Sequence, residues 1–136
     1  MNPRRVNGHF AGKFFDECWG VAIYLIWPVT PAQTSAYIKA QWGLDYQADD
    51  YCGTCYQIKT KDGTADLISL GRWEGDSFDH GELAHEALHA AVQILTRKGM
   101  KLTDESDEAY AYLTGSIVRR CLELIGERKI PLRPRR

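Results

Sequence analysis

The feature that most constrains the fold of this chain is a helix-forming segment, residues 79–97, that carries the sequence His-Glu-x-x-His at positions 85–89. His85, Glu86 and His89 fall on one side of this segment when it is drawn as a helix. The opposite side is hydrophobic and consists of Leu83, Ala84, Ala87, Ala91, Ile94 and Leu95. The pattern predicts an amphipathic helix that packs on a core through one side and presents titratable side chains on the other.

The spacing of the two histidines permits metal binding. Residues four apart on a helix share a face, with Cβ atoms about 5–6 Å apart. His85 and His89 can therefore direct ring nitrogens at one Zn²⁺, for which the Zn–N distance is about 2.0–2.1 Å. Glu86 can then reach a zinc-bound water as a general base. The alternative is that both histidines lie beside Glu86 on a solvated helix face, because this motif also arises by chance.

A third ligand is expected from a second helix downstream. A catalytic zinc site has three protein ligands and one open position. The acidic run at residues 104–108 begins another helical pattern that continues to about residue 125. Acidic residues in a first turn also complement the helix dipole, so the run does not require a metal. Taken alone, the residues leave Asp104, Glu105 and Glu108 open as ligands.

The pairing of His-Glu-x-x-His with a downstream Glu-x-x-Ala helix resembles the gluzincin-type zinc peptidases, of which thermolysin is the familiar member. It resembles still more closely the minimal single-domain metallopeptidases of phage and other mobile elements. The resemblance covers about residues 56–125 and implies that the third ligand is Glu108. The chain departs from the thermolysin pattern at Asp107, in place of Asn, and at Tyr112, in place of an Asp that orients a ligand histidine.

The resemblance implies a zinc-dependent hydrolase, most specifically a metallopeptidase that acts on a peptide or protein through metal-bound water activated by Glu86. A donor to the developing oxyanion is also needed. Tyr112, one turn from Glu108, is the first candidate, followed by Tyr110, His80 and His9.

The resemblance also implies that the strand at residues 65–70 pairs with extended substrate, although the sequence fits an interior strand equally well. Three other interpretations use the same residues. One is a catalytically degenerate zincin-like protein that binds or regulates a partner. Another is a hydrolase for a non-peptide amide. The last makes the histidine-bearing helix part of a plain helix pair without metal.

Length, charge and cysteine content limit the remaining possibilities. The 136 residues predict one domain at residues 1–127 and a basic, disordered tail at 128–136. A net charge of −1 argues against nucleic acid as a partner. Residues 1–13 contain no hydrophobic signal region, and the longest hydrophobic run is too short to cross a membrane, so a cytoplasmic location is expected. Cys52 and Cys55 are expected to flank a turn, with a second zinc site as the alternative.

The predicted fold class is α+β, with a small antiparallel sheet packed on helices. The expected elements are a strand at residues 21–27, a helix at 31–42, a hairpin at 56–70 around Asp62-Gly63, and the two ligand-bearing helices. Asp79 and Glu82 are expected to form a capping box for the first of these two helices.

Overall fold

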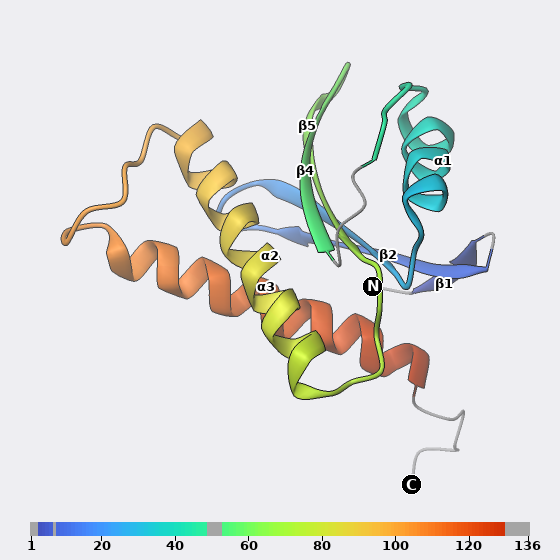
Figure 1. Ribbon diagram of the computed structural model, residues 1–136. Coiled ribbons are helices and arrows are strands. Elements are labelled where there is room, and N and C mark those ends of the chain that lie inside the picture. The colour runs from blue at the N-terminus through green and yellow to red at the C-terminus, as the bar shows by residue number, and fades with distance from the viewer. Residues whose placement is uncertain (1–2, 7, 49–52, 130–136) are drawn as a thin grey trace, which may run out of the picture.

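The structure, a computed structural model, describes residues 3–6, 8–48 and 53–129, with side chains described as far as residue 127. It is an α+β fold in which α1 covers one face of a five-stranded sheet, while α2 and α3 cover the other (Figure 1). In chain order the elements are β1 (Arg4–Val6), β2 (His9–Asp16), β3 (Val21–Trp27), α1 (Pro31–Trp42), β4 (Gly53–Thr60), β5 (Gly63–Leu70), α2 (Ser77–Arg97) and α3 (Asp107–Lys129).

The sheet is mixed, so the expected antiparallel sheet is wrong in one respect. The strand order is β1-β2-β3-β5-β4, and β3 and β5 run parallel while the other neighbours are antiparallel. The reason is the crossover through α1, after which the chain enters at the edge as β4 and returns through the hairpin as β5. A helical crossover is the usual connection between parallel strands. The strand at residues 65–70 is therefore interior, and the edge strand on that side is β4.

Alternating residues of the strands supply two separate cores. In β3, Val21, Ile23, Leu25 and Trp27 pack against α2 and α3, whereas Ile26 belongs to the smaller core beneath α1. Both faces of the central strands are thus covered, which explains why β3 reads as a continuous hydrophobic run. The layer between sheet and helix pair is the larger core and fixes the position of α2.

The helix over residues 31–42 is confirmed, together with its capping signals. The side chain of Thr30 accepts a hydrogen bond from the Gln33 backbone N–H, and the Gln33 side chain accepts one from the Thr30 N–H. Pro31 occupies the first turn, where its missing N–H costs nothing. The helix ends at Gly43, whose φ of 71° is readily adopted only by glycine.

The two long helices pack against each other as a hairpin (Figure 1). One face of α3 is buried against α2 and the sheet, through Tyr110, Leu113, Ile117, Cys121 and Leu124. This helix continues to Lys129, two residues into the segment expected to be a tail. Residues 130–136 lie outside the described part of the chain.

An ion pair joins the last turn of α2 to the middle of the sheet. Arg97 Nη1 and Nη2 donate to Asp66 Oδ1 and Oδ2 at 2.9 and 2.7 Å. Asp66 is fully buried, so this bidentate contact connects α2 and β5 inside the larger core. It therefore adds a polar link between α2 and β5 to the hydrophobic contacts of that core.

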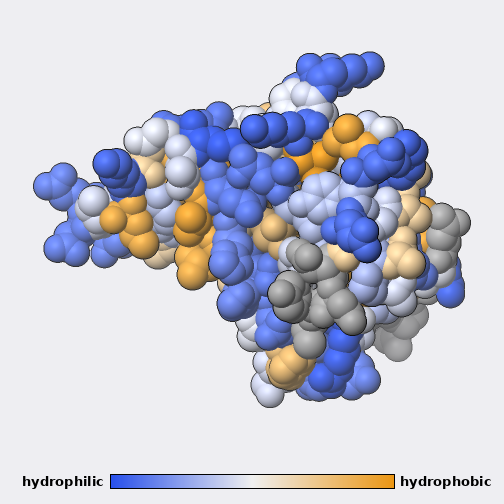
Figure 2. All heavy atoms as spheres, turned by 45° about the horizontal axis from the view of Figure 1, so that its top comes forward, coloured by the Kyte–Doolittle hydropathy of each residue, from blue (hydrophilic) through white to orange (hydrophobic). Residues whose placement is uncertain are grey.

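Hydrophobic side chains on the surface are dispersed on the face drawn in Figure 2, where they form small patches among hydrophilic ones. The large hydrophobic residues that are exposed include Phe15, Phe78, Leu88, Leu102 and Tyr112. Among the described residues, no helix has the length and hydrophobicity needed to cross a membrane.

Candidate metal centre

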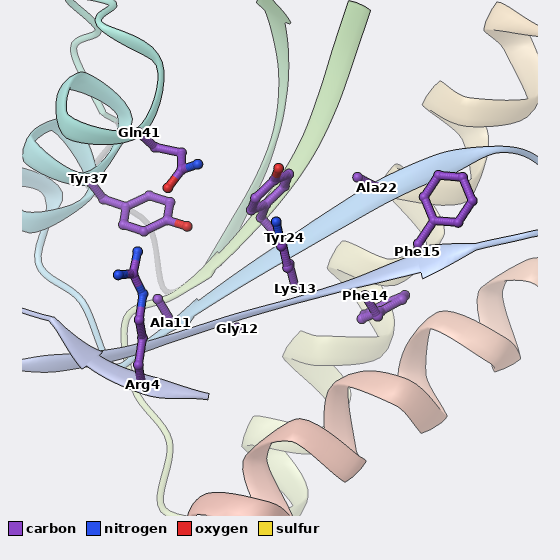
Figure 3. Close-up of a pocket in the computed structure, with 10 residues that line it drawn as sticks. All are labelled: Arg4, Ala11, Gly12, Lys13, Phe14, Phe15, Ala22, Tyr24, Tyr37 and Gln41. Carbon is purple, nitrogen blue, oxygen red and sulfur yellow. The ribbon is translucent and has the colours of Figure 1, made fainter. Parts of the chain in front are cut away.

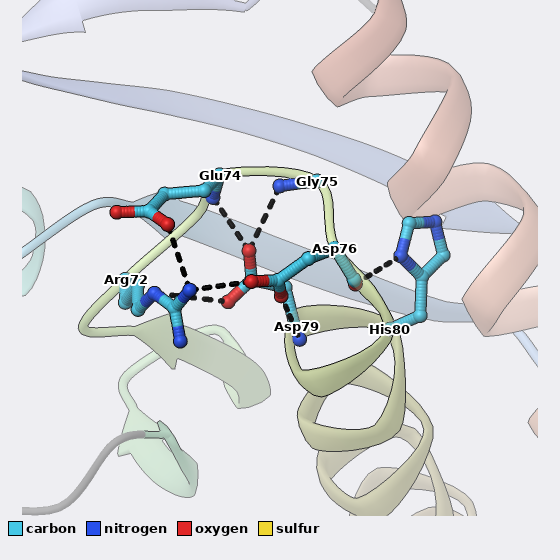
Figure 4. Close-up of polar contacts among 6 residues, drawn as sticks. All are labelled: Arg72, Glu74, Gly75, Asp76, Asp79 and His80. Carbon is cyan, nitrogen blue, oxygen red and sulfur yellow. Dashed lines mark hydrogen bonds and ion pairs between the residues drawn. The ribbon is translucent and has the colours of Figure 1, made fainter.

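A polar network fixes the start of α2 (Figure 4). The side chain of Asp76 caps the helix by accepting from the Asp79 N–H at 3.0 Å, so the cap lies three residues earlier than expected. The buried carboxylate of Asp79 accepts from the backbone N–H groups of Glu74 and Gly75 at 2.5 and 2.8 Å. Arg72 donates to Glu74 and Asp76. The backbone N–H groups of Glu74, Gly75 and Asp79 therefore all have hydrogen-bond acceptors. This network holds the start of the helix that carries His85.

The pKa of Asp79 reflects this environment. Burial raises it, but the hydrogen bonds from Glu74 and Gly75 and the nearby Arg72 guanidinium outweigh burial and hold the pKa below its ordinary value. Asp79 is therefore ionised at neutral pH and holds the loop and the first turn of α2 together.

The side chains of His85, Glu86 and His89 converge on the side of α2 that faces β4. The Nε2 atoms of His85 and His89 are 3.1 Å apart, and Glu86 Oε1 is 3.7 Å from His85 Nε2. One possible ligand atom from each of these three residues lies within 4.8 Å of the others. The sequence placed all three on one side of the helix, and the structure brings their polar atoms together.

The distance between the two imidazole nitrogens fits a shared metal ion. Two ligands of a tetrahedral zinc ion, each about 2.0–2.1 Å from it, lie about 3.3–3.4 Å apart. The observed 3.1 Å is close to that separation. Both histidine side chains are exposed, so a hydrated ion can reach them from solvent.

Glu86 differs from the two histidines because it is only 4% exposed. The beginning of β4 covers it, and a Cβ atom on Gly53 would lie 3.2 Å from Glu86 Cγ. A glycine at this position therefore gives the carboxylate the space it occupies. Burial raises the pKa of Glu86, His85 and His89 lower it, and Glu82 raises it, with a net shift above its ordinary value.

The three residues line a hollow of about 510 Å³ between α2 and the start of β4. Thr54, Cys55, Glu82 and Gln93 complete its polar lining. The thiol of Cys55 donates to Gln93 Oε1 at 3.4 Å, and burial raises the pKa of this thiol well above its ordinary value. Nothing in the motif itself indicated that β4 faces it, because the contact joins segments far apart in the sequence, such as Cys55 and Gln93, which are 38 residues apart.

Glu108 is not brought to this group. It is exposed in the first turn of α3, where the hydroxyl of Tyr110 donates to the carbonyl of Met100 at 2.7 Å, just beyond the end of α2. His89 lies eight residues before Arg97, the last residue of α2, which is about 12 Å along a helix axis. The first turn of α3 therefore adjoins the far end of α2. Asp104 and Glu105, the other acids considered, are exposed in the preceding loop.

The candidate oxyanion donors also lie away from the hollow. Tyr112 is 68% exposed on α3, and the hydroxyl of Tyr110 is engaged by a backbone carbonyl. His80 Nδ1 donates to the Asp76 carbonyl at 2.7 Å, at the start of α2. His9 is buried beneath α1 on the opposite face of the sheet. Of the cysteine pair, Cys55 lines the hollow, and Cys52 lies outside the described residues.

No protein-family model, curated protein or solved structure matches this chain.

Proposed function

We propose that this protein is a zinc-dependent hydrolase that cleaves peptide bonds at the hollow between α2 and β4. The observation that carries the proposal is the convergence of the His85 and His89 nitrogens, 3.1 Å apart, beside a buried glutamate. Structural zinc sites in proteins are closed by four protein ligands. In the described part of the chain the convergent group is His85, Glu86 and His89, and with Glu86 as the base the two histidines leave positions on an ion for substrate, water and a further ligand.

A bound zinc ion would supply Lewis-acid chemistry, polarising the scissile carbonyl and making an attacking water more acidic. Glu86 accepts a proton from that water as its oxygen adds to the carbonyl carbon. Glu86 then returns the proton to the departing amide nitrogen as the C–N bond breaks. His85 and His89 hold the ion, and the walls of the hollow limit access of bulk water to the carboxylate.

Edge strand β4 suggests a peptide as the substrate. In the described structure β4 is the end strand of the sheet and pairs with β5 on one side, so its other side forms the edge of the sheet at Gly53 and Thr54. An extended peptide that adds to this edge would run past Gly53 and Thr54, which line the same hollow as Glu86. Main-chain hydrogen bonds would then supply affinity with little dependence on sequence.

A second candidate function is binding of a partner without catalysis, and the number of metal ligands favours it. If Glu86 serves as the base, the described cluster retains only two metal ligands, His85 and His89. A protein with this ligand set could hold zinc weakly and act by binding a partner. Zinc binding without cleavage of any member of a peptide library would favour this function.

Zinc stoichiometry tests the proposal. Purified wild-type protein is expected to retain one zinc ion per chain after dialysis, because both imidazoles converge before the ion binds. His85→Ala and His89→Ala are each expected to weaken zinc binding by at least about tenfold. Plasma mass spectrometry and competition with a chromophoric chelator measure both quantities. His80→Ala is the matched control, since His80 lies outside the hollow. Equal zinc affinity in all four proteins would contradict the proposed centre.

Two glutamates compete for the role of third ligand. The family resemblance implies Glu108, whereas Glu82 lines the hollow one turn before His85. Loss of a zinc-binding carboxylate should lower affinity by more than the about 10–100-fold that loss of an outer-shell partner costs, so Glu82→Ala and Glu108→Ala will differ clearly in chelator competition. We expect the larger loss for Glu82→Ala, because Glu82 lines the same hollow as the two imidazoles, whereas Glu108 does not. A larger loss for Glu108→Ala would instead require the start of α3 to move toward His89.

A further inference from the structure

A second cavity, also of about 510 Å³, lies on the opposite face of the sheet, between α1 and strands β2 and β3 (Figure 3). Its polar lining consists of Arg4, Lys13, Tyr24, Tyr37 and Gln41. The rest of the lining is hydrophobic or glycine and includes Phe15 of β2. The volume lies within the range of about 300–1,000 Å³ that is typical of small-molecule sites.

The charged residues that line this cavity, Arg4 and Lys13, are both cations. No carboxylate lines it, and in the described part of the chain neither Arg4 nor Lys13 forms an ion pair. The ammonium of Lys13 lies 5.8 Å from the centre of the Tyr24 ring. Figure 3 shows the Arg4 side chain extending toward Tyr37 and the Lys13 side chain toward Tyr24. Because the whole chain has a net charge of −1, this pair of cations is a local feature.

Helix α1 contributes two neutral donors to the same space. Tyr37 is buried, and its ring makes edge contacts with His9 and Trp42 that hold it in place. Burial and the nearby Tyr24 raise the pKa of Tyr37 to about 12, against the opposing effect of Arg4. Its hydroxyl therefore remains a donor at neutral pH. Gln41 lies one turn further along the same face of α1.

We propose that this cavity binds a small phosphate monoester whose organic group is planar and hydrophobic. A phosphate monoester carries about −1.5 to −2 charges at neutral pH, which matches one guanidinium and one ammonium. Its three terminal oxygens can accept from Arg4, Lys13, Tyr37 and Gln41, and arginine binds phosphate oxygens in a bidentate manner. The Tyr24 ring beside Lys13 can pack against a planar group, and Phe15, 53% exposed, lies at the end of the cavity away from Arg4 (Figure 3).

Calorimetric titration of the full-length protein with phenyl phosphate tests this site. We expect phenyl phosphate to bind, inorganic phosphate to bind more weakly, and phenol not to bind at the same ionic strength. Arg4→Gln and Lys13→Gln should each weaken binding of phenyl phosphate by about tenfold or more, since each removes a charge-assisted hydrogen bond. Lys101→Gln, at an exposed lysine outside the cavity, should bind as the wild type does.

Three kinds of result would overturn the proposal. The first is a wild-type protein that does not bind phenyl phosphate, or an Arg4→Gln/Lys13→Gln double variant that binds it normally. The second is loss of binding in His85→Ala, which would locate the ligand at the metal centre. The third is a single-stranded oligonucleotide that binds at least about a hundredfold more tightly through the same two cations, which would make the surface a nucleic-acid interface.

Discussion

Replacing Glu86 with glutamine is expected to lower peptide hydrolysis by about 10²–10⁴-fold while leaving zinc stoichiometric. Glutamine has the same shape and fits the space beside Gly53, but its amide cannot accept the proton of an attacking water. His85 and His89 are untouched, so the ion should remain bound. Cleavage of a fluorogenic peptide library, followed by mass spectrometry of the products, measures the loss alongside zinc content.

Glu123→Gln is the matched control for this variant, because Glu123 is an exposed glutamate on α3 that pairs with Arg119 at the surface. It should retain wild-type turnover. Unchanged hydrolysis in Glu86→Gln would remove Glu86 from the role of base. If neither wild type nor variant cleaves any peptide although both bind zinc, the partner-binding function replaces the hydrolase.

The sequence predicted only the part of the candidate site that lies on one helix. Helical periodicity placed His85, Glu86 and His89 together, and the structure agrees. Periodicity does not indicate which segment packs over that face, so the burial of Glu86 beneath Gly53 could not be foreseen. The contact depends on β4 entering at the edge of the sheet.

The position of Glu108 shows a second limit. The interval between His89 and Glu108 fits a helix–loop–helix return if the first helix ends soon after the motif. That condition is not met, because α2 continues to Arg97, as the sequence pattern itself predicts, with Ile94 and Leu95 buried in its last turns, and α3 begins only at Asp107. Glu108 consequently lies in the first turn, beside the end of α2 and not beside the histidines.

Apart from the two N-terminal strands, the elements of the fold were predictable from the sequence, but the pairing of the strands was not. Local signals gave the strand at 21–27, the helix at 31–42, the hairpin around Asp62-Gly63 and the two long helices. The parallel pairing of β3 with β5 depends on contacts between distant segments, which no local pattern encodes. The two N-terminal strands were missed because β2 combines the glycine and lysine at positions 12 and 13 with aromatic residues that also fit an amphipathic helix.

Arg97→Met is expected to lower the free energy of unfolding by about 3–5 kcal/mol, the largest effect on stability that we predict. The substitution leaves the carboxylate of Asp66 buried without its partner. Burial already raises the pKa of Asp66, and the hydrogen bonds and charge of Arg97 oppose that rise. Without Arg97 the pKa of Asp66 should rise further. A carboxyl whose pKa is raised by folding stabilises the folded state at low pH and loses that stabilisation as pH increases.

Urea unfolding at pH 7 and pH 5 measures this effect, and the loss in Arg97→Met should therefore be larger at pH 7 than at pH 5. Arg119→Met is the matched control, because Arg119 pairs with Glu123 at the surface across 3.9 Å, and it should change stability by less than about 1 kcal/mol. Combining Arg97→Met with Asp66→Leu removes the unpaired charge and should restore most of the lost stability. A double variant no more stable than Arg97→Met would mean that the geometry of the ion pair, and not burial of a lone charge, holds α2 on the sheet.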